Sequence, residues 1–410
     1  MNYYSHYEKY LFLKRHFQKK HVVNICGHEG LGKSTLARYL SRDGTAFVSL
    51  YGSYGEMRER IGECVSIVSR MGKAAPGALV VDNCELPWGS GLTLEPVFQA
   101  WSGVPDDSGA LLVLVWNDAQ AMERHSIPGS ERVRVTGMSF ADFSRSFPHL
   151  SPAERVENFA AFGGMPVALN WVRQRDALSN VLSLIEQDGY ALHFPTDLMA
   201  RHTREYTRYL DIMRAVASGF RTHSAISEFT GIPARELSRY LSFLTEGMAI
   251  LRKEYPVTLE NRHMSARYSF NDLYMLFWSR FLRDAESMDR EEVFARISEG
   301  FTKHVSSAFA DIALEHYRIS LLHGRYSQAG QYWDRESSFG VVLDEETLTA
   351  HFIHAQWEGR VKKGALTGLV RQAANLHWHN GDRNEVFVIY TKEGCDFSTQ
   401  DAKIVHVADM

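Results

Sequence analysis

Five apolar runs alternate with helix-like segments in the first third of the chain. The runs lie at residues 21–26, 45–52, 77–83, 109–117 and 132–138. Several of them are apolar at nearly every position, which is typical of strands that are buried on both faces of a parallel sheet. Residues 56–71 have the periodicity of an amphipathic helix. This alternation predicts a doubly wound α/β sheet.

The middle of the chain predicts three helices and then two short strands. The helices are expected at residues 209–219, 223–231 and 233–248, and the strands at 249–257 and 266–270. This order is typical of a winged helix-turn-helix domain, in which the third helix can read DNA. The candidates for contact with nucleic acid are the basic residues Arg235, Arg239, Arg252 and Lys253.

Two acidic residues, Glu236 and Glu246, offset part of that basic charge. Winged helices also pack against other proteins, so a protein-binding role stays open beside DNA binding. Further along, residues 291–317, 339–357, 365–378 and 384–392 predict a helix, strands, a helix and a strand. A second α/β region is therefore expected at the end of the chain.

Composition limits the classes of protein that fit this pattern. The chain has 410 residues, so several domains are expected, and its 45% hydrophobic content is typical of a folded protein. The net charge of -4 provides no global basic field for nucleic acid or membrane. The sequence shows no apolar run of about 18 residues and no signal peptide. The four cysteines form no C-x-x-C pair, which argues against zinc and disulfides, and we expect a cytoplasmic protein.

A glycine-rich motif follows the first predicted strand. Residues 27–34 read GHEGLGKS and match G-x-x-x-x-G-K-[ST] between a strand and a helix. Such a loop turns its backbone N–H groups toward phosphate oxygens, and the helix N-terminus adds positive charge. ATP with Mg²⁺ is the expected ligand. The expected contacts are Gly27, Gly30, Leu31, Gly32, Lys33, Ser34 and Thr35.

Acidic and amide residues at strand ends complete the predicted site. Asp82 follows an apolar strand and is expected to hold Mg²⁺ together with Ser34. The next residue, Asn83, can orient a water molecule but cannot take its proton. Glu85 is either a solvated loop residue or a replacement base, and Asn117, after the fourth strand, is either a γ-phosphate sensor or an ordinary turn residue. Replacing Asn83 by Glu is expected to raise turnover unless Glu85 already supplies the base.

Several stretches carry a family resemblance. They are GGMP at 163–166 and the segments at 209–219, 237–257, 268–282 and 386–397. In this order they resemble the archaeal-type AAA+ ATPases, a STAND-related group of P-loop proteins. The most specific are GG-x-P and D-x-x-x-x-F-W-x-x-F. The resemblance implies an AAA+ core at 1–138, a helical lid at 139–200, a winged helix at 201–285 and a restriction-nuclease-like domain at 290–410.

The chain departs from the family pattern in three places. Asn83 stands where the family usually has glutamate, and Ser130 stands where an arginine is common. In the nuclease-like region, alignment on Trp357 puts Gly340, His354 and Gln356 at the positions of the metal aspartate, the glutamate and the lysine. Glu315 remains, but one carboxylate does not make a Mg²⁺ site for phosphodiester cleavage. Nuclease activity is therefore not expected. Arg360, Lys362 and Lys363 form either a small basic cluster or a solvated turn.

These features predict a nucleotide-dependent switch with slow ATP hydrolysis, because a missing general base costs about 10²–10⁴ in rate. The alternative is a scaffold or DNA-binding regulator that holds ATP without hydrolysing it. A protein partner or a homo-oligomer is expected in either case, because AAA+-type sites often borrow an arginine from a neighbouring subunit.

Overall fold

The structure of this chain is a computed structural model, and it describes residues 19–40, 45–71, 77–257, 266–334 and 338–410. The chain divides into two compact units. The first comprises Met1–Gly137 and Ser238–Leu251, and the second Met138–Leu237 and Arg252–Met410. Residues 1–18, the part of the sequence where a signal peptide would lie, are outside the described residues.

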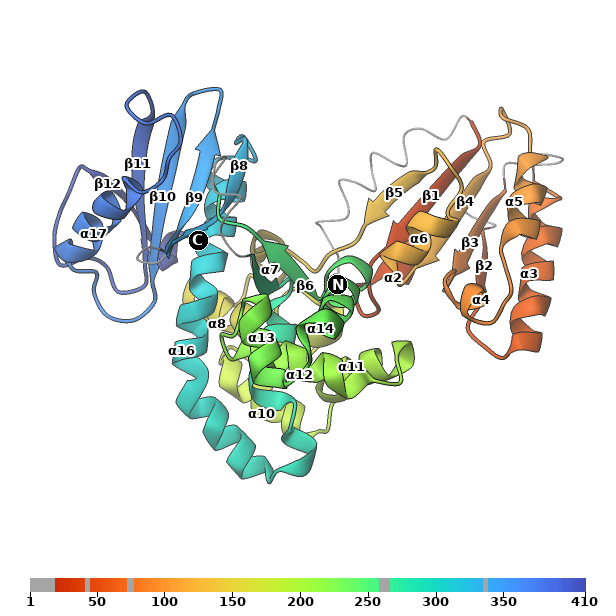
Figure 1. The fold of residues 1–410 in the computed structure, drawn as a ribbon, viewed down its shortest axis with the longest axis horizontal. Coiled ribbons are helices and arrows are strands. Elements are labelled where there is room, and N and C mark those ends of the chain that lie inside the picture. The colour runs from red at the N-terminus through yellow and green to blue at the C-terminus, as the bar shows by residue number, and fades with distance from the viewer. Residues whose placement is uncertain (1–18, 41–44, 72–76, 258–265, 335–337) are drawn as a thin grey trace. The chain divides into compact units, whose positions relative to one another are not determined.

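The first unit contains a five-stranded parallel sheet in the order β2-β3-β4-β1-β5 (Figure 1). Its strands are β1 (His21–Cys26), β2 (Ala46–Ser49), β3 (Ala78–Asp82), β4 (Leu111–Trp116) and β5 (Glu131–Arg134). Every residue of β3 and β4 is buried, as the continuous apolar runs predict. The predicted parallel α/β sheet is confirmed.

Short helices connect and cover the strands of this sheet. They are α2 (Lys33–Leu40), α3 (Tyr54–Val68), α4 (Leu86–Gly89), α5 (Glu95–Ser102) and α6 (Ala119–His125). Helix α3 begins at a capping box in which Ser53 and Glu56 satisfy each other's backbone N–H groups. Apolar side chains of α3 and α5 pack on the sheet, where Cys64, Val97 and Leu112 have no exposed surface. Three of the four cysteines are buried and all four are unpaired.

The second unit begins with a group of helices. They are α7 (Phe140–Ser146), α8 (Pro152–Phe162), α9 (Pro166–Leu169), α10 (Ala177–Glu186), α11 (Tyr190–His202), α12 (Tyr206–Ala217) and α13 (His223–Thr230). Helix α14 (Ala234–Ser242) crosses into the first unit at Ser238 and continues there into the π-helical turn η1 (Phe243–Gly247). Strand β6 (Leu251–Glu254) pairs with β7 (Arg267–Phe270). Three helices followed by two strands is the order that the sequence predicts. Gly219 and Gly231 have φ of 97° and 67° at helix ends, as expected for C-caps.

The remainder of the second unit contains a mixed five-stranded sheet that packs against a long helix. The helical elements are α15 (Leu273–Phe277), η2 (Trp278–Leu282), η3 (Ala285–Ser287), α16 (Arg290–His316), η4 (Tyr317–Leu321), α17 (Lys363–Ala373) and η5 (Val407–Asp409). The strands are β8 (Gln328–Trp333), β9 (Ser338–Asp344), β10 (Thr349–Gln356), β11 (Asn384–Thr391) and β12 (Ala402–His406). The sheet order is β12-β11-β10-β9-β8. The sequence predicts β9, β10 and β11 but misses both edge strands, β8 and β12.

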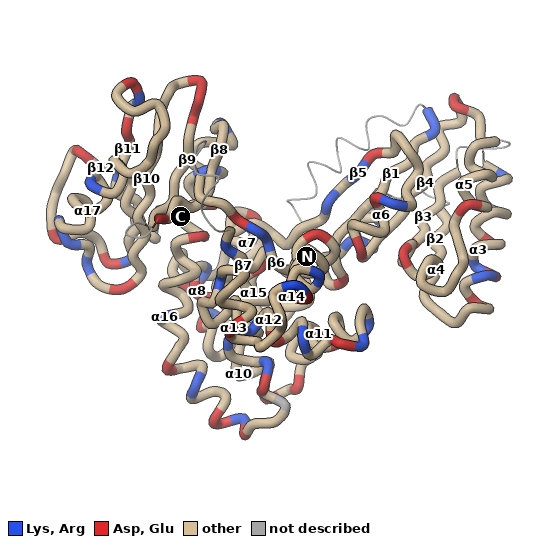
Figure 2. The backbone as a smooth tube through the Cα atoms, viewed as in Figure 1, with Lys and Arg blue, Asp and Glu red and all other residues tan. Residues whose placement is uncertain are grey.

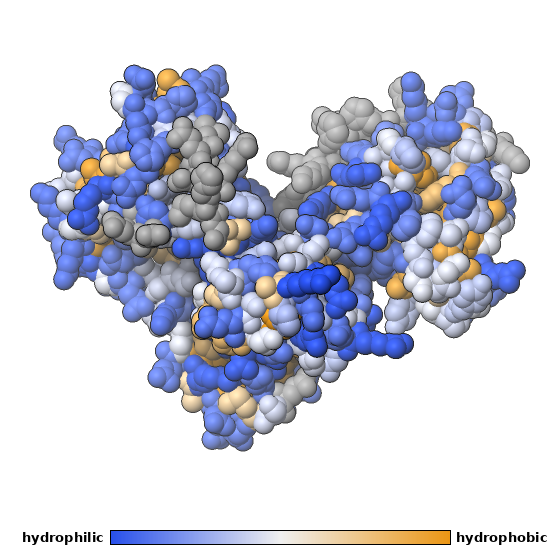
Figure 3. Space-filling model, in the orientation of Figure 1, coloured by the Kyte–Doolittle hydropathy of each residue, from blue (hydrophilic) through white to orange (hydrophobic). Residues whose placement is uncertain are grey.

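None of the helices in the described ranges combines the length and the apolar character that a membrane crossing requires. Hydrophilic residues cover most of the face shown in Figure 3, and apolar areas on it are small and scattered. Surface of this kind is typical of folded proteins in water.

Two of the stretches that carry the family resemblance meet inside the second unit. Gly163 ends α8 with φ 57° and ψ -151°, and the next N–H, that of Gly164, donates to Oδ2 of Asp272 at 2.9 Å. The other oxygen, Oδ1, accepts from the N–H of Tyr274 at 2.8 Å and so caps α15. The GGMP turn and the start of the D-x-x-x-x-F-W-x-x-F segment are thus joined by the carboxylate of Asp272.

We predict that Gly163→Ala strongly destabilises this unit. Its φ and ψ lie close to a region that is almost restricted to glycine, which costs about 1–3 kcal/mol for other residues. In addition, an added Cβ would lie 2.3 Å from Oδ1 of Asp272. Chemical denaturation should show a larger loss than for the control Gly231→Ala, where an added Cβ meets nothing within 4 Å. Equal losses would show that the contact with Asp272 is unimportant.

A second prediction concerns pH. Burial raises the pKa of Asp272 from 3.8 to about 6. The folded state therefore holds this proton more tightly than the unfolded state, so the contribution to stability is present below pH 3.8 and is lost as pH rises through about 6. The stability advantage of wild type over Asp272→Asn should shrink by at most about 3 kcal/mol across this range. A difference between the two proteins that does not change with pH would contradict the shifted pKa.

Candidate functional site

The loop between β1 and α2 has the backbone conformation that its glycines permit. Gly27, Gly30 and Gly32 have φ of 157°, 83° and 80°. At Gly27 an added Cβ would lie 2.7 Å from the carbonyl oxygen of Val135, so the backbone passes too close for any side chain. The loop leads directly into α2, so the unpaired N–H groups of that helix start at the same place. Leu31 is buried, whereas Thr35 is exposed.

Lys33 is the first residue of α2, and only 5% of its surface is exposed. Its Nζ donates to the carbonyl oxygen of His28 at 2.8 Å, which folds the side chain back over its own loop. Burial lowers the pKa of the Lys33 ammonium, and the carboxylates of Glu85 and Asp82 act to raise it. A buried cation inside a glycine-rich loop is suited to binding a phosphate group.

Ser34 and Asp82 form the contact that joins the loop to β3. The Ser34 hydroxyl donates to Oδ2 of Asp82 at 2.7 Å, and the other carboxylate oxygen accepts from the N–H of Asn83 at 2.9 Å. Asp82 ends β3 and is 8% exposed. A hydroxyl beside a carboxylate offers the oxygen ligands that Mg²⁺ prefers. The structure thus brings together the two residues that the sequence predicts as metal ligands.

Asn117, Asn83 and Glu85 form a second polar cluster at the ends of β3 and β4. Nδ2 of Asn117 donates to Oε1 of Glu85 at 2.7 Å and to Oδ1 of Asn83 at 3.0 Å. The backbone N–H of Asn117 donates to Oε2 of Glu85 at 3.0 Å. Burial raises the pKa of Glu85, while the bonds from Asn117 and the charge of Lys33 lower it. Glu85 is therefore half-buried and bonded to the end of β4 rather than a solvated loop residue.

Helix α6, which follows Asn117, contacts the end of α14 and η1 within the first unit. Asp118 accepts from two N–H groups of α6 and caps that helix. Two residues later, Nε2 of Gln120 lies 3.3 Å from Oε2 of Glu246 and 3.5 Å from Oγ of Ser242. The polar cluster at the end of β4 is thus close along the chain to a contact with the third helix of the predicted winged helix. No pattern in the sequence indicates this pairing, which spans more than 120 residues.

The predicted nucleic-acid residues have different surroundings. Arg235 and Arg239 are exposed on α14, and a guanidinium nitrogen of Arg239 donates to the hydroxyl of Tyr240 at 3.1 Å. Lys253 is exposed, and its Nζ lies 5.5 Å from the centroid of the Tyr255 ring. Arg252 is half-buried. Basic and acidic positions are interspersed along the chain (Figure 2).

The guanidinium of Arg252 is already paired with two carboxylates. It lies 2.5 Å from Glu254 and 3.8 Å from Asp311 on α16. An arginine held in this way has less freedom to reach a phosphate backbone, because both ion pairs would have to break. Arg235, Arg239 and Lys253 are therefore the better-placed members of the predicted set.

In the second unit, the positions expected for nuclease acids lie on two antiparallel strands. Gly340 on β9 is opposite Ile353 on β10, and His354 and Gln356 follow on β10. Glu315, which remains from the family pattern, accepts from the N–H of Phe140 at 2.5 Å and so binds the start of α7. In the described part of the chain, no group of three or more His, Cys, Asp and Glu side chains is placed to hold a metal ion.

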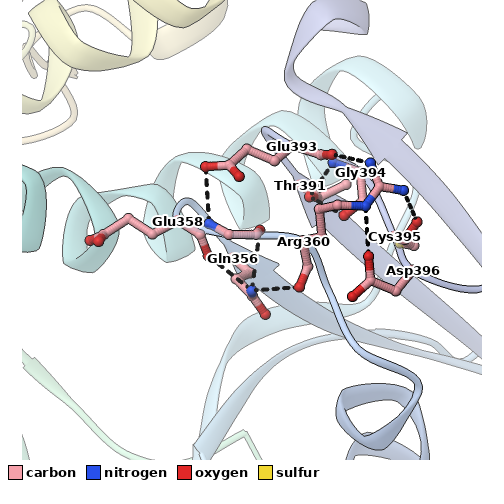
Figure 4. A network of polar contacts seen from close by, with 9 residues as sticks. Gln356, Glu358, Arg360, Thr391, Glu393, Gly394, Cys395 and Asp396 are labelled. Atoms are coloured by element: carbon pink, nitrogen blue, oxygen red, sulfur yellow. Dashed lines mark hydrogen bonds and ion pairs between the residues drawn. The ribbon is translucent and has the colours of Figure 1, made fainter.

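The loop after β10 is closed by Arg360 (Figure 4). Its Nε donates to Oδ1 of Asp396 at 2.6 Å, and further nitrogens donate to the carbonyl oxygens of Glu393 and Cys395. Nε2 of Gln356 donates to the carbonyl oxygen of Glu358 at 2.9 Å in the same loop. Arg360 therefore holds two loops together, which accounts for this arginine without a ligand.

Parts of the chain are similar to a protein family and to a solved structure. Residues 274–367 are similar to DUF234, described as archaea bacterial proteins of unknown function. No curated protein matches the chain. Among solved structures, the chain is similar to a chain of "Structure of Drosophila ORC bound to DNA", with 12% identity, 67% of this chain and 85% of that chain covered, and a TM-score of 0.29. The family similarity begins at α15 and ends within α17, and it leaves the phosphate loop outside.

Proposed function

We propose that this protein binds ATP with Mg²⁺ through a P-loop core of the AAA+ type. The observation that carries the proposal is the 2.7 Å hydrogen bond from Ser34 to Asp82, next to the buried ammonium of Lys33. In P-loop NTPases the lysine of the loop binds the phosphates, and a loop hydroxyl and an acid at a strand end hold the metal. In the order β2-β3-β4-β1-β5, strand β4 lies between β1, which leads into the glycine-rich loop, and β3, which ends at Asp82. Because these strands are parallel, their carboxyl ends lie at the same edge of the sheet.

The residues present fit both parts of this ligand. Gly27 has no room for a side chain, and Gly30 and Gly32 have the positive φ that lets a loop turn its backbone N–H groups toward a phosphate. Ser34 and Asp82 would hold the metal, whose role is to neutralise charge on the phosphates. Lys33 would replace its bond to the His28 carbonyl by a bond to a phosphate oxygen.

We further propose that nucleotide binding acts as a switch on the following domain. The contact of Gln120 with Glu246 and Ser242 supports this, because it lies directly beyond Asn117 and Asp118. A ligand that moves Asn117 would move the start of α6 and with it the partner of η1. In this proposal the domains are the AAA+ core at 1–138, a lid at 139–200, a winged helix at 201–285 and a nuclease-like domain at 290–410 without cleavage activity.

Removing the Lys33 ammonium should abolish tight nucleotide binding. The loss of one buried charged partner costs about 2–5 kcal/mol, or roughly 30-fold to a few thousand-fold in affinity. Titration with a fluorescent ATP analogue should show this for Lys33→Ala. The control Lys303→Ala removes an exposed lysine of α16 and should bind as wild type does. Equal affinity of all three proteins would refute the proposal.

A separate prediction concerns the proposed metal ligands Ser34 and Asp82. Mg²⁺ should tighten ATP binding by wild type, and this gain should be lost in Asp82→Asn and reduced in Ser34→Ala, because each change removes one oxygen ligand or its charge. The measurement is calorimetric titration of ATP with Mg²⁺ and with EDTA. A gain from Mg²⁺ that is unchanged in Asp82→Asn would place the metal elsewhere.

DNA is a second candidate ligand, supported by the exposure of Arg235 and Arg239 on one helix. If α14 contacts a phosphate backbone, the double variant Arg235→Ala/Arg239→Ala should bind DNA more weakly and lower the salt-dependence slope by about one per lost contact. Fluorescence anisotropy at several salt concentrations measures both. Arg371→Ala, which removes an exposed arginine of α17, is the control. An unchanged slope would exclude this helix as the DNA contact.

A further inference from the structure

Both polar atoms of the Asn83 side chain, directly after Asp82, form hydrogen bonds within the protein. Asn83 has φ 62°, a conformation that asparagine tolerates better than most residues. Its Nδ2 donates to Oγ of Ser49 at 3.0 Å, and its Oδ1 accepts from Asn117 at 3.0 Å. Asn83 therefore links the ends of β2, β3 and β4. Because an amide has no basic site at neutral pH, it cannot take a proton from water.

The left-handed turn at Asn83 determines where Glu85 lies. The N–H of Cys84 donates to the carbonyl oxygen of Val115 at 3.0 Å, which fixes the turn against β4. The N–H of Leu86 donates to the carbonyl oxygen of Asn83 at 3.2 Å and closes it. Glu85 then directly precedes α4, and both of its carboxylate oxygens accept from Asn117. The carboxylate is held at the edge of the sheet by two bonds from one residue.

The surroundings of Glu85 suit a group that takes a proton. Burial disfavours its ionised form and raises its pKa. The ammonium of Lys33 opposes this effect, and among the groups that raise the pKa of Lys33, Glu85 acts more strongly than Asp82. Asp82 ends β3 and Asn117 follows β4, so the Glu85 carboxylate is held at the edge of the sheet where the phosphates are expected. Bases of this kind work best when their pKa is closer to the pH of the reaction.

We propose that Glu85 is the general base of ATP hydrolysis in this protein. It would take the role of the glutamate that the resembled family usually has at the position of Asn83. The oxygen of a water molecule forms a bond to the γ-phosphorus, and the bond from that phosphorus to the bridging oxygen of ADP breaks. The electron pair stays on the ADP oxygen, and the proton of the water goes to the Glu85 carboxylate. Asn117 is a positioning residue that aims this carboxylate. The inference rests on the proposed ATP site.

The direct test compares Glu85→Gln with wild type. Steady-state phosphate release should fall by about 10²-fold or more, the usual contribution of a general base. ATP affinity should change by less than about threefold, because the glutamine side chain has nearly the same size as that of glutamate. Glu59→Gln removes an exposed carboxylate from α3 and should behave as wild type.

A second measurement does not depend on the steady-state rate. Protein loaded with ATP and Mg²⁺ is passed over a desalting column, and the retained nucleotide is identified by chromatography. Wild type should accumulate ADP, whereas Glu85→Gln should retain ATP. Asn83→Glu should give no higher turnover than wild type, because the base is already present.

Three results would overturn the inference. They are ATP-loaded wild type that releases no phosphate, Glu85→Gln that keeps its turnover within about threefold, and Asn83→Glu that is clearly faster than wild type. Each leaves the proposed ATP site intact. Failure of wild type to bind ATP would instead refute the proposed function itself, so the two failures are distinguishable.

Discussion

The hydrogen bond between the Ser34 hydroxyl and the Asp82 carboxylate is the contact on which the candidate site depends. It joins the start of α2 to the end of β3, although the two residues lie 48 positions apart in the chain. Both ends are fixed by buried structure, since β3 is buried at every position and Lys33 is buried beside Ser34. A hydroxyl and a carboxylate that are held together in this way can accept a metal ion with little rearrangement, which favours binding.

Around this contact, buried polar groups satisfy one another. Asn117 donates three hydrogen bonds, two to Glu85 and one to Asn83. Buried polar networks of this kind are costly when any member is unpaired, so a change at one residue affects the others. In the proposed switch, a bound phosphate would act on the Asn117 turn through this network. The contact of Gln120 with Glu246 would pass the change on to η1.

The sequence predicted the parallel sheet well, because its strands are apolar at almost every position and are separated by clear helical periods. It also named Ser34 and Asp82 as ligands of one metal ion, which requires the two side chains to lie close together, and they are 2.7 Å apart. It could not decide where Glu85 points, because that depends on the left-handed turn at Asn83. Nor could it show that Arg252 is paired with Asp311, which is distant in the chain and comes close only when the chain folds.

Edge strands and long-range caps were missed for a related reason. The segment of β8, QAGQYW, has no run of apolar residues, and its strand conformation comes from pairing with β9. Likewise, the GGMP motif marked a family resemblance, but nothing in the sequence showed that the N–H of Gly164 would donate to Asp272, 108 residues away. Patterns within a short window report burial and local turns, whereas these features arise from contacts between distant segments.

The most direct test of the central claim is a crystal structure of the protein with Mg²⁺ and a non-hydrolysable ATP analogue. The triphosphate is expected against the backbone amides of residues 27–34, with the metal bound by Ser34 and close to Asp82. A nucleotide bound at another place, or a metal that contacts neither of these residues, would contradict the account.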